Sequence, residues 1–244
     1  MANPTAAMLV IGDEILSGRT RDANMYHLAG KLTEAGIDLK EVRVVADDAP
    51  KIEAAVASLA HKHDHLFTSG GIGPTHDDIT ADCVAAAMGA LIDVRDDARA
   101  ILQAHYDRQG MEMNDARLRM ARIPNGALLI DNPVSHAPGF SLGNVHVMAG
   151  VPKIFEAMVE GLLPTLTGGD PLLSVTVRVD RGEGDIAGPL GELAASNPNL
   201  SFGSYPFQKK DGRYGANLVI RGTDLSQINE AAARLKEIFG DDAT

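Results

Sequence analysis

The sequence predicts an α/β protein in which a mostly parallel sheet is covered by helices on both faces, giving three layers, α/β/α. Two observations carry this prediction. Short apolar runs of strand length alternate with longer segments in which apolar residues recur at helical spacing. A glycine-rich turn also joins one strand directly to a helix, which is typical of α/β proteins that bind phosphate. With 244 residues, 45% of them hydrophobic, the chain is long enough for one large domain and a small companion.

The first part of the chain alternates strands and helices most clearly. Asp22 can cap one helix and Gly36 can end it, while Pro50 suits the first turn of the next helix. This order favours parallel strands, because a helix crosses over the sheet between each strand and the next. We expect strands at residues 6–11, 37–46 and 65–68, and helices at residues 22–36, 50–60 and 79–88.

The rest of the first domain is less regular. A turn at residues 124–126 and a proline-containing loop at residues 132–139 interrupt the periodic segments. We expect helices at residues 96–109, 115–122 and 153–166, and strands at residues 127–130 and 145–149.

The segment from Thr167 to Pro171 contains two glycines and a proline and is the best domain boundary in the sequence. We therefore predict a first domain at residues 1–168 and a small α+β module at residues 169–244. The module shows the order β-α-β-β-α and is about the size of a ferredoxin-like module. Its strands are expected at residues 173–179, 200–206 and 214–221, and its helices at residues 186–196 and 225–239.

The most informative motif runs from Ser69 to Thr80 and reads Ser-Gly-Gly-Ile-Gly-Pro-Thr-His-Asp-Asp-Ile-Thr. A glycine turn between a strand and a helix exposes backbone N–H groups that can bind phosphate. The acidic pair Asp77 and Asp78 beside such a site indicates a divalent cation such as Mg²⁺ between carboxylate and phosphate. The turn lacks the lysine of a P-loop, and His76 stands where a dinucleotide fingerprint requires glycine.

Other acidic and glycine-rich segments follow the ends of the predicted strands. Ligands of open α/β sheets bind beyond the carboxyl ends of the strands, so these segments are expected to meet the glycine turn at one edge. Some of the aspartates have a simpler interpretation as helix caps, namely Asp22, Asp48 and Asp77. We expect Cys83 to be a core residue and His61, His63 and His65 to form a solvated helix end rather than a metal site.

Composition limits the possible partners. A net charge of −11 and an aromatic content of 4% argue against a nucleic-acid-binding surface. The single cysteine is typical of a cytoplasmic protein. We expect no signal peptide and no membrane association, because the sequence has no leader pattern and no apolar run of about 18 residues.

Four ordered motifs resemble one known family. They are Gly12-Asp-Glu-Ile-Leu-Ser-Gly18 followed by Asp22 and Asn24, the Ser69–Thr80 motif, Asn132-Pro with Ala-Pro-Gly139, and Gly150-Val-Pro152. Together they resemble the molybdopterin-binding (MoaB/MogA-like) superfamily, and more closely the N-terminal part of the competence/damage-inducible CinA proteins. The final module is similar to the small domain that follows in those proteins.

The resemblance implies a fold and an activity. The fold would be a three-layer domain that binds molybdopterin or a nucleotide diphosphate. The activity would be metal-dependent hydrolysis of ADP-ribose to AMP and ribose 5-phosphate. The family's two functional aspartates match Asp47 and Asp78, and the glycine turn matches its phosphate-binding loop. The family also implies a homo-oligomer, a dimer or trimer. The nicotinamide-mononucleotide deamidase domain of many CinA proteins is not expected here.

Two alternatives remain open beside hydrolysis: adenylyl transfer onto molybdopterin, and binding of molybdopterin or a nucleotide without turnover. The segment Met148-Ala-Gly-Val-Pro152 departs from the family pattern, and so does Ser135 in the Asn132 loop. Both departures lie at the expected rim of the site, so they bear on the identity of the ligand.

The candidate site follows from these motifs. We expect Asp47 and Asp78 to be catalytic, and Asp13, Asp47 and Asp78 to bind Mg²⁺ or another divalent cation. The expected ligand-binding residues are Gly12, Asp13, Glu14, Ser69, Gly70, Gly71, Gly73, Pro74, Thr75, His76, Asp77, Pro138, Gly139, Gly150 and Pro152. The ligand would be a small nucleotide or a pterin phosphate such as molybdopterin.

Overall fold

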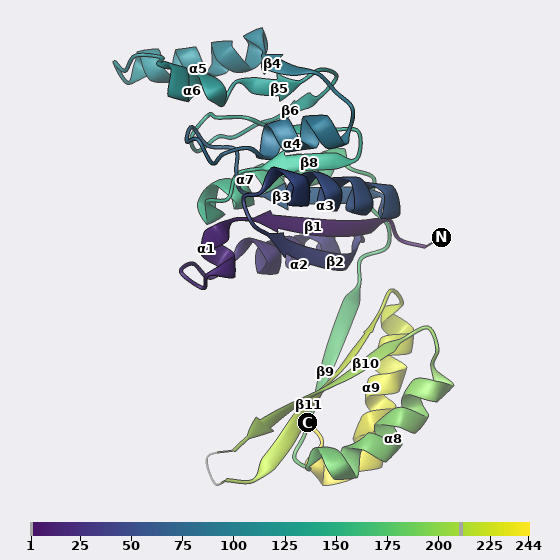
Figure 1. Cartoon of the computed structure of the whole chain (residues 1–244). Helices are drawn as coiled ribbons and strands as arrows, with labels where there is room; N and C mark the ends of the chain where they lie inside the picture. The colour runs from purple at the N-terminus through teal and green to yellow at the C-terminus, as the bar shows by residue number, and fades with distance from the viewer. Residues whose placement is uncertain (1, 210–211) are drawn as a thin grey trace. The chain divides into compact units, whose positions relative to one another are not determined.

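The computed structural model describes residues 2–209 and 212–244. The chain divides into two compact units, Met1–Gly169 and Asp170–Thr244, which are both visible in Figure 1. The first unit has two buried apolar clusters and the second unit has its own.

The first unit is built on a six-stranded sheet with the order β2-β1-β3-β8-β7-β6. Strands β2, β1, β3 and β8 run parallel, whereas β7 and β6 join the edge in antiparallel pairs. The strands are β1 (Thr5–Ile11), β2 (Asp38–Val45), β3 (His65–Ser69), β6 (Leu128–Ile130), β7 (Gly139–Leu142) and β8 (Val145–Met148). The prediction of a mostly parallel sheet is confirmed.

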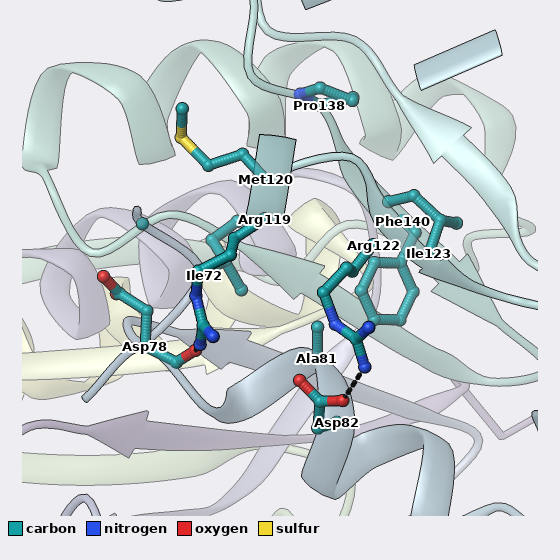
Figure 2. A pocket seen from close by; sticks show the side chains of 11 residues that line it. Ile72, Asp78, Ala81, Asp82, Arg119, Met120, Arg122, Ile123, Pro138 and Phe140 are labelled. Atoms are coloured by element: carbon teal, nitrogen blue, oxygen red, sulfur yellow. Dashed lines mark hydrogen bonds and ion pairs between the residues drawn. The ribbon is translucent and has the colours of Figure 1, made fainter. Parts of the chain in front are cut away.

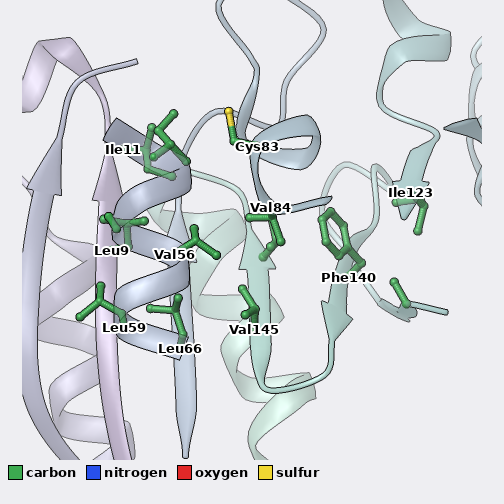
Figure 3. Close-up of a cluster of buried hydrophobic side chains, with 14 of the residues drawn as sticks. Leu9, Ile11, Val56, Leu59, Leu66, Cys83, Val84, Ile123, Phe140 and Val145 are labelled. Carbon is green, nitrogen blue, oxygen red and sulfur yellow. The ribbon is translucent and has the colours of Figure 1, made fainter. Parts of the chain in front are cut away.

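Helices cover both faces of this sheet and complete the three layers (Figure 1). On one face lie α2 (Asn24–Glu34) and α7 (Pro152–Leu162), and on the other lie α3 (Ala49–Lys62) and α4 (Thr80–Ala87). Strand β1 serves both layers, since its side chains alternate between the faces. Ala7, Leu9 and Ile11 belong to the cluster drawn in Figure 3, and Ala6, Met8 and Val10 belong to the opposite cluster.

A small substructure is inserted between α4 and β6. It contains a two-stranded antiparallel sheet of β4 (Ile92–Val94) and β5 (Arg122–Pro124), together with α5 (Asp96–Arg108) and α6 (Asp115–Arg119). Ala98 and Leu102 of α5 are buried in the same apolar cluster as residues of α3 and α4. The insertion therefore packs on the α3/α4 side of the sheet.

The second unit has the predicted order β-α-β-β-α. It consists of β9 (Leu173–Val179), α8 (Glu183–Ser196), β10 (Ser201–Gln208), β11 (Tyr214–Gly222) and α9 (Leu225–Phe239). Its antiparallel sheet has the order β10-β11-β9, and α8 and α9 supply Ile186, Ile228 and Leu235 to its core.

Several short elements differ from the sequence prediction. The helix expected at residues 115–122 ends at Arg119, and residues 122–124 form β5 instead. Strands β4 and β7 and the four-residue helix α1 (Asp13–Leu16) were not predicted. Elements of three or four residues are too short to show a repeat of either period, and Gly139 begins β7 although glycine usually indicates a turn.

The prediction that the three histidines around residue 63 form a solvated helix end is wrong for two of them. His63 is only 7% exposed. His65 is half-buried, and its Nδ1 lies 3.1 Å from Nε2 of buried His146 on β8. The sequence could not indicate this contact, because it depends on the pairing of β3 with β8. Among the described residues, no helix is long and apolar enough to cross a bilayer.

Candidate functional site

A cavity of about 560 Å³ lies where the four parallel strands end. The segments that follow β1, β2, β3 and β8 each contribute to its wall, as expected for the carboxyl edge of an open α/β sheet. Its volume is typical of sites for small molecules and cofactors. The lining residues are Ile11, Gly12, Glu14, Thr20, Asp47, Gly70, Gly71, Ile72, Gly73, Pro74, Asp77, Asp78, Met120, Asn132, Ser135, Ala137, Ala149, Gly150, Val151, Pro152 and Ile154.

The glycine turn after β3 has a backbone shape that requires glycine. Gly70 and Gly71 have φ values of 108° and 68°, which side-chain-bearing residues rarely adopt. A Cβ on Gly70 would lie 2.2 Å from the carbonyl oxygen of Ile11, and a Cβ on Gly150 would lie 3.1 Å from Cα of Gly70. The turn therefore packs directly against the backbone that follows β1 and β8.

This turn offers backbone N–H groups to the cavity. The N–H of Gly70 donates to the carbonyl of Met148 at 3.2 Å, so it is not available to a ligand. The N–H groups of Gly71, Ile72 and Gly73 make no hydrogen bond within the described part of the chain, and all three residues line the cavity. Three N–H groups of the turn are therefore open to a ligand, and that of Gly70, which the sequence also predicts to bind the ligand, is not.

Asp78 is held in place by its own loop. Its Oδ2 accepts hydrogen bonds from the N–H and the hydroxyl of Thr75, at 2.8 and 2.5 Å. Its Oδ1 has no hydrogen-bond partner among the described residues. The carboxylate is fixed through one oxygen and presents the other, which is the arrangement expected of a metal ligand or a general base.

Asp47 is held in the same way from the end of β2. Its Oδ2 accepts a hydrogen bond from the N–H of Asp13 at 2.9 Å. Burial raises the pKa of Asp47, and the negative charges of Asp13, Glu14 and Asp77 raise it further, while the hydrogen bond from Asp13 opposes this. Burial is thus the main cause of the raised pKa, and the smaller part that comes from neighbouring carboxylates shows negative charge at this edge, which favours binding of a cation.

A divalent cation fits this donor set, since Glu14, Asp47, Asp77 and Asp78 all line the cavity and supply the hard oxygen ligands that Mg²⁺ prefers. Nowhere in the described chain do three His, Cys, Asp or Glu side chains lie close enough together to hold a metal ion. A cation here would therefore use one or two carboxylates and complete its coordination with ligand phosphates and water, which is usual for Mg²⁺.

Two buried asparagines shape the walls. Asn24 is 3% exposed, and its Nδ2 donates to Oγ of Ser69 at 2.7 Å and to the carbonyl of Gly150 at 2.8 Å. This ties α2 to both glycine segments. Asn132 is 1% exposed; its Nδ2 donates to Oγ of Ser135, and its Oδ1 accepts from the N–H of Ser135. Ser135, which departs from the family pattern, thus helps to hold the Asn132 loop in its conformation through these two hydrogen bonds.

A much smaller pocket adjoins the main cavity on the far side of Asp78. The two share Ile72, Gly73, Asp78 and Met120. Figure 2 shows that two arginines of the inserted substructure enter this pocket and that Arg122 forms an ion pair with Asp82. Arg119 lies beside Asp78, where its Nη2 donates to the backbone carbonyl at 3.3 Å.

Eleven of the predicted site residues line the main cavity: Gly12, Glu14, Asp47, Gly70, Gly71, Gly73, Pro74, Asp77, Asp78, Gly150 and Pro152. Six do not. Asp13 contributes its N–H to Asp47, Ser69 accepts from Asn24, and Thr75 binds Asp78. The remaining three are His76, whose side chain is 98% exposed, Pro138, which lines the smaller pocket, and Gly139, which is buried beside Val147.

Two of the three aspartates that the sequence offers as helix caps do accept a hydrogen bond at the start of a helix, and the third does not. Asp48 accepts from the N–H of Lys51 and caps α3. Asp22 accepts from the N–H of Met25 at the start of α2. Asp77 caps nothing, since no side chain caps α4, and it lines the cavity instead.

The sequence does not indicate which apolar residues line the cavity. Met120, Val151 and Ile154 reach the cavity from different segments of the chain. None of the three is a polar or catalytic residue type, so only the folded arrangement identifies them as lining residues.

Comparison with known proteins agrees with the two-unit organisation of the chain. The model of a family described as a probable molybdopterin-binding domain matches residues 7–168. A model described as the middle domain of FAD synthase matches residues 171–244.

Individual relatives extend this result. A protein of Pyrobaculum calidifontis is 35% identical over 212 residues, covering 83% of this chain and 81% of that protein. A probable FAD synthase of Caenorhabditis briggsae is 31% identical over 96% of this chain and 49% of that protein, so the chain spans about half the length of that relative.

Among solved structures, CinA of Thermoplasma acidophilum, described as having unknown function, is similar to this chain. The TM-score is 0.61 and the sequence identity is 33%, over 66% of this chain and 98% of that one. The resemblance drawn from the sequence motifs is therefore confirmed, and the chain belongs to the molybdopterin-binding (MoaB/MogA-like) family, with a CinA-like first domain.

Proposed function

We propose that this protein hydrolyses the pyrophosphate bond of an ADP-linked molecule, such as ADP-ribose, with the help of a divalent cation. The products from ADP-ribose would be AMP and ribose 5-phosphate. One observation carries the proposal. Three N–H groups without a hydrogen bond to any described residue, those of Gly71, Ile72 and Gly73, lie in the same cavity as the carboxylates of Asp47 and Asp78.

The chain's own residues would bind and orient the diphosphate. The N–H groups of the glycine turn would donate hydrogen bonds to phosphate oxygens and stabilise the charge that develops during the reaction. Asp78, fixed by Thr75, and Asp47, fixed by the N–H of Asp13, would each direct one free oxygen toward the reacting group. Their held orientation would reduce the entropy that must be lost on reaching the transition state.

The bond changes are those of a simple hydrolysis. A water oxygen forms a bond to one phosphorus, and the bond from that phosphorus to the bridging oxygen breaks. The bridging oxygen leaves with the other phosphate, and the water's proton passes to a nearby carboxylate or to solvent. A cation held by Asp47 and Asp78 would supply neutralisation of phosphate charge and a lower pKa for an adjacent water.

The size of the cavity and the relatives support this proposed substrate class. A volume of about 560 Å³ leaves room for more than a diphosphate, and the apolar side chains of Met120, Val151 and Ile154 in its lining can contact a base. FAD is a second substrate to test, because a probable FAD synthase is among the relatives and the family model of the FAD synthase middle domain matches residues 171–244. FAD, like ADP-ribose, carries an AMP unit on a pyrophosphate.

The test is release of AMP from purified protein incubated with ADP-ribose or FAD, with Mg²⁺, Mn²⁺ or Co²⁺ and with EDTA. We expect cation-dependent AMP release. Asp78→Asn and Asp47→Asn should each reduce the rate by roughly two orders of magnitude, because each removes a positioned charge. Asp107→Asn is the matched control, since Asp107 lies on the exposed side of α5 and contacts Gln103.

The folded state of each variant is checked by its melting curve. AMP release that persists in Asp78→Asn would place the chemistry elsewhere. If well-folded protein releases no AMP from either substrate with any cation, the hydrolysis proposal is wrong.

A second candidate is supported by the family description itself, a probable molybdopterin-binding domain. The same N–H groups and carboxylates would serve adenylyl transfer onto molybdopterin, because that reaction also involves a phosphoanhydride to AMP. If the protein binds molybdopterin with an increase in melting temperature and forms an adenylylated product from ATP, this second function replaces hydrolysis. Binding without any product would indicate a carrier.

A further inference from the structure

The main cavity has an unusual charge balance for a site that binds phosphate. Glu14, Asp47, Asp77 and Asp78 line it, whereas no lysine, arginine or histidine does among the described residues. A diphosphate would bring further negative charge. The N–H groups of one short turn can hold one phosphate. A cation held by Asp47 and Asp78 would offset part of the remaining negative charge, and a positive side chain beside the turn would give a second phosphate a direct partner.

Arg119 is the cationic residue that reaches this region from outside the cavity. It is the last residue of α6, and its Nη2 donates to the carbonyl of Asp78 at 3.3 Å. In Figure 2 the guanidinium lies beside Asp78, at the pocket that shares Ile72 and Gly73 with the main cavity. Arg119 therefore approaches the glycine turn from the inserted substructure.

The neighbouring arginines are already paired, and Arg119 is not. Arg122 forms an ion pair with Asp82 in the same small pocket. Arg117, two residues earlier on α6, donates to the carbonyl of Glu112 and stacks over the ring of Tyr106. Within the described part of the chain, the side chain of Arg119 forms no ion pair and only the one hydrogen bond, to the carbonyl of Asp78. A guanidinium has five N–H donors, so most of its capacity is open to a ligand.

We propose that Arg119 is a specificity-determining residue that binds the second phosphate of the ligand and so selects diphosphates over monophosphates. This inference rests on the proposed site, with one phosphate held by the glycine turn. The single phosphate of AMP would occupy the turn and leave Arg119 unused. In an ADP-like ligand, the next phosphate would extend past Asp78 to the guanidinium, whose planar fork matches two phosphate oxygens.

The test compares equilibrium binding of two ligands in the presence of Mg²⁺: AMP, and the α,β-methylene analogue of ADP, which cannot be hydrolysed between its phosphates. The full chain is used as wild type, Arg119→Gln, Arg119→Lys and the control Arg117→Gln. Arg119→Gln should weaken binding of the analogue by roughly 10- to 100-fold and that of AMP by less than about 3-fold. Arg119→Lys should restore part of the loss because it keeps the charge.

Salt dependence separates this role from a purely structural one. The preference of the wild type for the diphosphate should decrease as NaCl is raised, because screening weakens charge interactions, whereas Arg119→Gln should show little change. If Arg119→Gln weakens both ligands equally, Arg119 only supports the loop and the inference is wrong. Retention of the full diphosphate preference, or the same loss in Arg117→Gln, would also overturn it.

The outcome is independent of turnover. If the wild type selects the analogue through Arg119 yet releases no AMP from ADP-ribose or FAD, the hydrolysis proposal fails and the assignment of Arg119 stands. If the wild type hydrolyses these substrates and Arg119→Gln keeps the same selectivity, the hydrolysis proposal stands and the assignment of Arg119 fails. A wild type that binds neither ligand would contradict both.

Discussion

At the scale of single residues, Gly70 has the least freedom to change. Its φ is 108°, and a Cβ at this position would lie 2.2 Å from the Ile11 carbonyl oxygen. These are separate constraints, one on conformation and one on space. Gly71 shares the first constraint, and its Cβ would lie 2.2 Å from Oγ1 of Thr80. The glycine turn that lines the cavity can therefore form only because neither residue has a Cβ.

Gly70→Ala should therefore lower the free energy of unfolding by about 3 kcal/mol, since backbone strain and steric overlap act together. Gly89→Ala is the matched control. Gly89 also has positive φ, at 68°, but a Cβ there meets nothing within 4 Å, so its cost should be about 1 kcal/mol. Urea denaturation measures both. Equal losses of unfolding free energy in the two variants would show that the backbone near Ile11 shifts at little cost to make room for the new Cβ.

His146 makes stability depend on pH. Burial lowers its pKa to about 4, and the adjacent His65 contributes to the same lowering. The unfolded state, with the ordinary value of 6.5, then binds more protons than the folded state between these two values. The stabilisation is complete above about pH 6.5 and is lost as pH falls toward 4.

Because of His146, we expect the free energy of unfolding to be about 2 kcal/mol lower at pH 5 than at pH 7. His146→Leu should remove most of that difference, whatever it does to absolute stability. His61→Gln, at an exposed position, should leave the difference unchanged. Denaturant titrations at pH 5 and pH 7 measure these free energies. If His146→Leu shows the same difference between the two pH values as the wild type, His146 is not its source.

At the scale of elements, the sequence predicts the regular helices and parallel strands well and the short elements poorly. Runs such as β1 and α3 are long enough to show their periods, and Asp48 and Pro50 begin α3 as expected. Strand β7 pairs between β6 and β8 through only four residues, and its position is set by those neighbours rather than by its own pattern.

The same distinction applies to the site. The glycines and aspartates belong to local motifs that follow strand ends, so the strand order alone brings them together. Arg119 contacts Asp78 across 41 residues of sequence, and its place depends on how the inserted substructure packs. No local pattern in the sequence contains that information.

The cap of α3 can be tested as an element. Asp48 accepts a hydrogen bond from the N–H of Lys51 and also forms an exposed ion pair with its Nζ at 3.4 Å. Asp48→Ala should cost about 1 kcal/mol, because it leaves a helix N–H without a partner. Lys51→Ala removes only the ion pair and should cost less than about 0.5 kcal/mol. Equal costs in denaturation would mean that the ion pair, not the cap, matters.

At the scale of the whole molecule, the two units have separate apolar cores. The second unit buries its own cluster, which includes Leu235, and the cavity is lined by residues of the first unit alone. A change in the core of the second unit is therefore expected to leave the cavity intact.

Leu235→Ala should destabilise the second unit by about 2–5 kcal/mol, because Leu235 is fully buried. Leu225→Ala, on the same helix but 52% exposed, is the control. Calorimetry should show one transition shifted to lower temperature, with binding of the ADP analogue unchanged. A shift of the entire unfolding profile, or loss of binding, would show that the units depend on each other.

The alternation of β1 between two apolar clusters has a further consequence. Ala7, Leu9 and Ile11 face one helical layer while Ala6, Met8 and Val10 face the other, so neither layer can separate from the sheet without exposing this strand. Amide protons of β1 should exchange with deuterated solvent only when the first unit opens completely, and they should be the slowest in it. The strand that leads into Gly12 would then be the last part of the domain to lose its structure.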